Sequence, residues 1–137
     1  MALDIDKHLG VLPAALAVRG RRTEVLATNL ANADTPHFKA RDLDFREALA
    51  AASSPGATGR PVALVTTQHG HLGGAPSADP SDAALKYRVP LAPSLDGNTV
   101  DAQLEQAAFA ENAVRYQATL TFLSSRFRSL MTAITGQ

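Results

Sequence analysis

Histidines are the residues in this sequence whose type and spacing come nearest to a chemical site. His69 and His71 are separated by one glycine, a spacing that could supply two ligands of a metal ion. A metal site needs at least a third ligand, and no carboxylate cluster lies near this pair in the sequence. His8 and His37 each stand alone. We therefore interpret His69 and His71 as solvent-facing loop residues and predict no metal ligand.

Nucleophilic and acid–base chemistry find no better support. The chain has no cysteine, which excludes thiol catalysis, disulfides and zinc–thiolate sites. Asp42 and Asp44 lie one residue apart, but they stand between Arg41 and Arg46 and are interpreted as members of surface ion pairs. We predict no catalytic residue, no cofactor and no small-molecule substrate. The sequence thus indicates a protein that is not an enzyme.

The charge balance argues against a nucleic-acid partner. Lys and Arg number 13, and Asp and Glu also number 13. The one basic cluster, Arg19-Gly20-Arg21-Arg22, is short, and we interpret it as a solvated helix face. Of the 137 residues 45% are hydrophobic, and many of these are alanine. Such a chain can bury a thin core, such as the seam between two helices.

The first residues do not form a secretory signal. Asp4 and Asp6 precede the first basic residue, Lys7, and no long apolar stretch follows. The longest apolar runs are only a few residues, too short to span a bilayer. We expect the protein to stay in the cytosol or to leave by a route that uses no cleaved signal peptide.

Proline and glycine divide the chain into three segments, 1–52, 53–98 and 99–137, which we interpret as one structural unit. The middle segment holds six of the eight prolines and six of the nine glycines. Weak strand patterns at Val62–Thr67 and Leu85–Leu91 predict a small β-hairpin or an extended loop there. The outer segments are rich in alanine and leucine and predict helices.

The first segment predicts a long helix from about Leu12 to Ala33. Pro13 fits the first turn of a helix, so residues 4–11 form a separate or kinked piece. The helix ends before Pro36, and a shorter helix follows at Asp44–Ala52. Apolar residues at three- and four-residue steps make one face of the long helix a candidate assembly seam. Its members are Leu9, Leu12, Leu16, Leu26 and Leu30.

The last segment predicts a single helix from about Thr99 to Thr135, with Asn98 as N-cap and Asp101 three residues on. At about 1.5 Å per residue this helix is about 50 Å long, more than a compact domain of this size can cover. It must therefore meet other chains or protrude. Its apolar residues alternate at four and three steps, a seam of period 3.5. They are Phe109, Ala113, Tyr116, Leu120, Leu123, Phe127, Leu130 and Ile134.

These patterns predict a mainly α fold in which long N- and C-terminal helices form a coiled-coil-like pair around an irregular middle segment. Two readings of the seams remain open. In the first, the two seams pack against each other in a monomeric helical hairpin. In the second, they also form contacts between the subunits of a polymer.

Residues 28–39 closely resemble a signature of the bacterial flagellar rod and hook family, in which an N-terminal helix ends in an Asn-x-x-Asn-x-x-Thr-Pro-Gly-aromatic pattern. Residues 40–45, 93–101 and 110–118 are similar to the proximal rod members of that family in particular. His37 stands where the family usually has glycine, and Gln106 where it often has methionine. The matching motif residues are Asn29, Asn32, Thr35, Pro36, Phe38, Asp96, Gly97, Asn98, Val100 and Asp101.

The resemblance implies a structural role in the basal-body rod. Such proteins polymerise helically, transmit motor torque across the periplasm, line the export channel and are exported through the flagellar type III apparatus without cleavage. The implied partners are copies of the chain, other rod proteins, basal-body ring and rod-adaptor proteins, and the export apparatus. Phe45 and Leu49 resemble a short export-gate docking motif, with ordinary packing of a short helix as the other reading. The alternative function is a soluble helical adaptor or secretion chaperone that binds a single partner.

Overall fold

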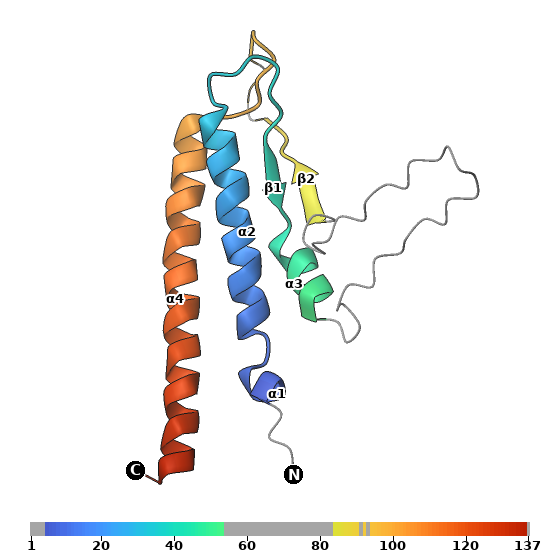
Figure 1. Cartoon of the computed structure of the whole chain (residues 1–137). Helices are drawn as coiled ribbons and strands as arrows, with labels where there is room; N and C mark the ends of the chain where they lie inside the picture. The colour runs from blue at the N-terminus through green and yellow to red at the C-terminus, as the bar shows by residue number, and fades with distance from the viewer. Residues whose placement is uncertain (1–4, 54–83, 91, 93, 137) are drawn as a thin grey trace, which may run out of the picture.

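Two long antiparallel helices, α2 (Leu12–Ala31) and α4 (Ala102–Thr135), run side by side through the molecule (Figure 1). The computed structural model describes residues 5–53, 84–90, 92 and 94–136. The predicted mainly helical fold is confirmed. The smaller elements are α1 (Ile5–Leu9), β1 (Arg41–Leu43), α3 (Phe45–Ser53) and β2 (Leu85–Tyr87).

The N-terminal helix is broken near its start, as the sequence predicts. Gly10 separates α1 from α2 and has a φ of 61°, a left-handed conformation that glycine adopts at little cost. Pro13 follows in the first turn of α2, where its missing N–H has no helical partner to lose. At the other end α2 stops at Ala31, two residues before the predicted end. The N–H groups of Asn32 and Ala33 donate instead to carbonyls three residues back, which tightens the last turn.

The C-terminal helix begins later than predicted. Its N-cap is Asp101, whose Oδ1 accepts hydrogen bonds from the N–H of Gln103 at 3.0 Å and of Leu104 at 3.2 Å. Asn98 was expected in this place, and that prediction is wrong. Its side chain instead donates to carbonyls at the end of α2. Figure 1 shows α4 continuing past the start of α2, and its 34 residues make it about 51 Å long.

A two-stranded antiparallel sheet connects distant parts of the chain. β1 pairs with β2 in the register Arg41↔Tyr87 and Leu43↔Leu85. The predicted strand at Leu85–Leu91 is present over its first three residues. Its expected partner at Val62–Thr67 lies outside the described residues, and the observed partner, β1, was not predicted.

The hydrophobic core is thin and lies between α2 and the layer formed by the sheet and α3. α2 contacts α4 on one side and β1 and α3 on the other. Leu26 of α2 is fully buried. Among the described residues, no helix is both long and apolar enough to cross a membrane. The core cluster contains Val18, Leu43, Ala48 and Ala84, with Phe45, Ala52 and Leu85 packed against it.

Candidate assembly interface

A line of buried polar side chains faces α2 along the C-terminal helix. Glu105, Asn112 and Thr119 of α4 are spaced seven residues apart, Asn98 lies seven residues before Glu105 in the loop that precedes the helix, and all four are buried. Residues at this interval lie on one face of a helix that packs in coiled-coil fashion. The contact between α2 and α4 is therefore built around hydrogen-bonding groups as well as apolar ones.

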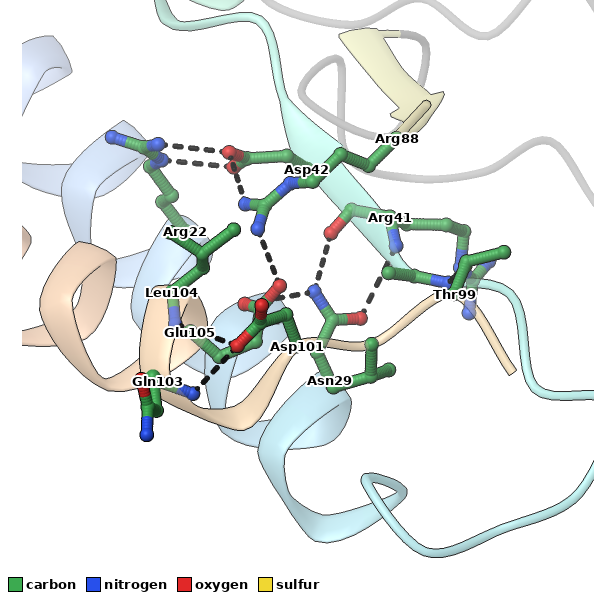
Figure 2. A network of polar contacts seen from close by, with 12 residues as sticks. Arg22, Asn29, Arg41, Asp42, Arg88, Thr99, Asp101, Gln103, Leu104 and Glu105 are labelled. Carbon is green, nitrogen blue, oxygen red and sulfur yellow. Dashed lines mark hydrogen bonds and ion pairs between the residues drawn. The ribbon is translucent and has the colours of Figure 1, made fainter. Parts of the chain in front are cut away.

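The upper part of this contact contains a charge network that joins α2, β1, α4 and the residue that follows β2 (Figure 2). Arg22 of α2 binds Asp42 of β1 through two parallel hydrogen bonds, at 2.9 and 2.8 Å. Arg88, just after β2, donates to the same carboxylate at 2.8 Å and to Glu105 of α4. Asn29 of α2 donates to Glu105 at 3.3 Å and to the backbone oxygen of Arg41 at 2.6 Å. Two cations meet two anions, so the network is neutral.

The network stabilises the ionised forms of Asp42 and Arg22. Burial alone disfavours the charged form of Asp42. The hydrogen bonds and positive charge of Arg22 outweigh it, together with the hydrogen bonds from Arg88 and from the Leu43 N–H, so the pKa of Asp42 lies below its usual value. The hydrogen bond from Arg22 to Asp42 in turn raises the pKa of Arg22. Removing one partner would leave the other charge incompletely compensated inside the protein, which lowers the free energy of unfolding.

A second polar contact lies further along the helix pair. Asn112 of α4 donates to the backbone oxygen of Arg19 at 3.0 Å and to the hydroxyl of Thr23 at 2.9 Å. Because Asn112 is only 1% exposed, these bonds fix the helices in one register. Thr119 bonds within α4, its hydroxyl donating to the backbone oxygen of Arg115.

The structure places the apolar seam of α4 beside this polar line rather than on it. The seam therefore flanks the contact with α2, and its members are unequally covered. Phe109 is 37% exposed, Phe127 46% and Ile134 76%, and Ala113 is also exposed. Tyr116, Leu120, Leu123 and Leu130 are partly buried. On the N-terminal side Leu9 and Leu26 are buried, and Leu12, Leu16 and Leu30 are partly buried.

The motif residues lie together at the upper end of the helix pair, where two loops cross. Asn98 donates to the backbone oxygens of Asn32 at 3.1 Å and Ala33 at 2.7 Å, which closes the end of α2. The loops are further joined by bonds from the His37 N–H to the Asp96 oxygen at 3.0 Å and from the Thr99 N–H to the Phe38 oxygen at 3.0 Å. Asn29 lies in the last turn of α2, and Asp101 caps the start of α4. Thr35, Pro36, Gly97 and Val100 complete the set.

His37 adopts the left-handed backbone conformation that the resemblance implies for this position. Its φ is 62°, a region where glycine is favoured and histidine is better tolerated than most residues. Gly97, opposite it, has a φ of 71°, and a Cβ there would lie 2.9 Å from the His37 Nδ1. A Cβ at position 97 would therefore sit on a strained backbone conformation and would displace the His37 ring.

The residues of the candidate export motif lie on α3. Phe45 is partly buried, and its ring lies 4.4 Å from the guanidinium carbon of Arg19, close enough for a cation–π contact. Leu49, one turn later, is partly buried. In the folded chain both side chains are thus engaged in packing.

The interpretation of Asp42 as a member of a local surface pair is wrong. Its partners are Arg22 and Arg88, which lie 20 and 46 residues away in the sequence. Asp44 pairs with Lys86 at 2.9 Å on the exposed side of the sheet. Arg22 also departs from the expected solvated face, because its side chain is only 19% exposed. The equal numbers of basic and acidic residues are visible in the sequence, but which of them pair in the folded chain is not.

The described part of the chain brings together no group of three or more His, Asp or Glu that could hold a metal ion. His69 and His71 lie outside the described residues.

Comparison with known proteins identifies relatives along nearly the whole chain. No family model matches it. The flagellar basal body rod protein FlgB of Cereibacter sphaeroides is 47% identical over 130 residues, which cover 95% of each chain. FlgB of Aeromonas hydrophila is 44% identical over 140 residues, covering 100% of this chain and 99% of the relative. FlgB of Escherichia coli K12 is 42% identical over 131 residues, covering 95% and 94%.

An elongated helical pair, tied by polar contacts and flanked by a half-exposed apolar seam, is typical of a subunit built for assembly. Together with these relatives it defines the class as structural proteins of the bacterial flagellar rod. Within that class the chain belongs to the FlgB family of flagellar basal body rod proteins.

Proposed function

We propose that the chain is a structural subunit of the flagellar basal-body rod that polymerises helically through its two long helices. The observation that carries this proposal is the seam of α4, along which large apolar side chains remain substantially exposed in the single chain. Exposed apolar patches of this kind mark interaction surfaces. The role is mechanical and needs no catalytic step.

Burial of the seam supplies a driving force for assembly. Complete burial of a phenylalanine side chain contributes about 1.5–3 kcal/mol. Phe127 retains 46% of its exposure, so covering it on assembly yields about 1 kcal/mol. Phe109 and Ile134 add similar amounts, and a polymer repeats the gain for every subunit.

The polar contacts suit a subunit that transmits torque. Apolar packing alone allows two helices to slide past one another, whereas the bonds of Asn98, Glu105 and Asn112 to α2 fix one register. A rod that carries motor torque across the periplasm needs subunits whose helices do not shift under load. We therefore assign the polar line to stiffness and the apolar seam to assembly.

The proposed location is the periplasmic part of the basal body, around the channel through which later subunits pass. The proposed partners are copies of the chain, other rod proteins, and ring and rod-adaptor proteins of the basal body. The subunit would reach this place through the flagellar type III export apparatus, without cleavage. Phe45 and Leu49 would serve as its docking motif before folding, because folding engages both in packing.

Assembly in solution and in the cell tests the proposal. A rod subunit forms helical polymers above a threshold concentration and is recovered in purified basal bodies in several copies. A soluble adaptor or secretion chaperone instead forms a complex of fixed size with one partner and is absent from washed basal bodies. Electron microscopy of the purified chain at rising concentration, with mass spectrometry of basal bodies, separates the two outcomes.

A further inference from the structure

We propose that Glu105 makes the docking of α4 onto the rest of the chain conditional on the pairing of β2 with β1. This coupling acts within one molecule and goes beyond the proposed function. Three features of the structure support it. They are the place of the hydrophobic core, the polar character of what α4 buries, and the single residue that links the sheet to α4.

The hydrophobic core of the described chain contains no residue of α4. Its buried members come from α2, β1, α3 and the residue before β2, and they are Val18, Leu43, Ala48 and Ala84. The buried residues of α4 are instead all polar, namely Glu105, Asn112 and Thr119. The sheet, α2 and α3 therefore share a core without α4, which lies against α2 through polar contacts and half-covered apolar side chains.

Glu105 brings a negative charge into the contact between α4 and α2. Its side chain is only 1% exposed, and its described partners are Asn29 at 3.3 Å and Arg88. Asn29 is neutral and also donates to the Arg41 backbone oxygen, so the compensating positive charge in direct contact comes from Arg88. A buried carboxylate without a paired cation is strongly disfavoured. Without Arg88, docking of α4 carries that cost, whereas the undocked helix leaves the carboxylate in water.

Arg88 reaches Glu105 from a position that the sheet determines. Its backbone N–H donates to the Ala40 oxygen at 2.9 Å, which holds the end of β2 beside the start of β1. Its guanidinium donates to Asp42 of β1 at 2.8 Å, and Figure 2 shows it between the two carboxylates. Among the described residues, this side chain makes the only hydrogen bond or ion pair that links the sheet to α4. Arg88 therefore stands opposite Glu105 only after the two strands have paired.

These contacts give the docking of α4 a defined condition. While β2 is unpaired, docking buries an uncompensated carboxylate and is disfavoured. Once the strands have paired, Arg88 is in place, and the same carboxylate holds the helix. In the rod subunit proposed above, the apolar seam of α4 then takes its place beside α2 only in a chain whose sheet is complete. That consequence rests on the proposed function, whereas the condition on docking does not.

Hydrogen exchange of the purified full chain, diluted until it is monomeric, tests the coupling because α4 and α2 report separately. In the native chain we expect protected amides in both helices. Arg88→Met should speed exchange around Asn112 of α4 at least about tenfold more than around Val18 of α2. Adding Glu105→Gln to this variant should restore the protection of α4. Glutamine has a similar shape and accepts a hydrogen bond from Asn29, but it needs no cation.

Two substitutions at Lys86 separate strand pairing from the loss of a charge. Lys86 lies at the centre of β2 and binds Asp44 and Glu47 on the exposed side of the sheet. Lys86→Pro removes a backbone donor from the strand and leaves Arg88 in the chain. We expect it to speed exchange in α4 of the native chain but not in α4 of the Glu105→Gln variant. Lys86→Met is the matched control, because it removes the same charge and should leave α4 protected.

Three results would overturn the coupling. The first is equal acceleration of exchange in α2 and α4, or complete unfolding, in the Arg88→Met variant, because the chain then behaves as one cooperative unit. The second is failure of Glu105→Gln to restore the protection of α4. The third is an unprotected α4 in the native chain, since the helix is then not docked. These measurements do not depend on rod assembly, so they distinguish failure of the coupling from failure of the proposed function.

Discussion

Phe127→Asp should abolish rod assembly while leaving the single chain folded. Phe127 lies on the α4 seam and is 46% exposed, so the substitution removes about 1 kcal/mol of burial that assembly would gain. Covering an unpaired carboxylate adds at least about 2 kcal/mol. The sum, about 3 kcal/mol per contact, weakens each contact by about two orders of magnitude. Leu123→Asp should act in the same direction.

Swimming in soft agar and recovery of the subunit in basal bodies measure this loss. Ala118→Asp places the same charge on the same helix, on the side away from the seam. It should leave swimming and recovery of the subunit in basal bodies unchanged. Circular dichroism of each purified variant checks that the helices still form. Normal swimming of Phe127→Asp cells, or equal defects in both variants, would show that the seam is not an assembly surface.

Three further predictions concern the interior of the subunit and its export. Asp42→Asn should lower the free energy of unfolding in urea by about 2 kcal/mol, because it leaves Arg22 without its carboxylate partner. Folding lowers the pKa of Asp42, so the ionised carboxylate stabilises the folded chain above pH 3.8, its unfolded pKa, and this stabilisation is lost as the pH falls below that value. The stability of the Asp42→Asn variant should therefore depend less on pH in the acid range. Gly97→Ala should lower the free energy of unfolding by at least about 1–2 kcal/mol through backbone strain, and contact with His37 should add to this loss. The added loss should disappear when Gly97→Ala is made in the His37→Gly variant. An equal loss in the native chain and in the His37→Gly variant would contradict the contact between the two positions. Phe45→Ala should retain the subunit in the cytosol at normal abundance, whereas normal export without rod assembly would make Phe45 a packing residue.

The helices could be predicted from the sequence because their signals are local. The proline in the first turn of α2 and the apolar steps along α4 each lie within a few residues of the structure they determine. The resemblance of residues 28–39 likewise rests on a continuous motif. These features were sufficient for the fold class and for the family.

The charge network could not be predicted, because its members are brought together only by the fold. Asp42 meets Arg22 and Arg88 across 20 and 46 residues, and β1, which carries Asp42, is only three residues long and pairs with a distant strand. The polar line of α4 was missed for a different reason. A search for apolar periodicity passes over Glu105 and Asn112, although their seven-residue interval was visible in the sequence.

The position of Asn98 shows the limit of local rules. An asparagine with an acid three residues later is a common helix start, and the pattern would fit an N-cap. The end of α2 presents two backbone oxygens close by, and the side chain of Asn98 donates to them instead. Asp101 then takes the capping role, so a tertiary contact overrides the local preference.

Electron microscopy of basal bodies purified from cells that lack this chain tests the central claim most directly. If the chain is a structural subunit of the rod, these basal bodies should lack an assembled rod, and expression of the native chain should restore it. Expression of the Phe127→Asp variant should not restore the rod. A complete rod in cells without the chain would contradict the proposed function.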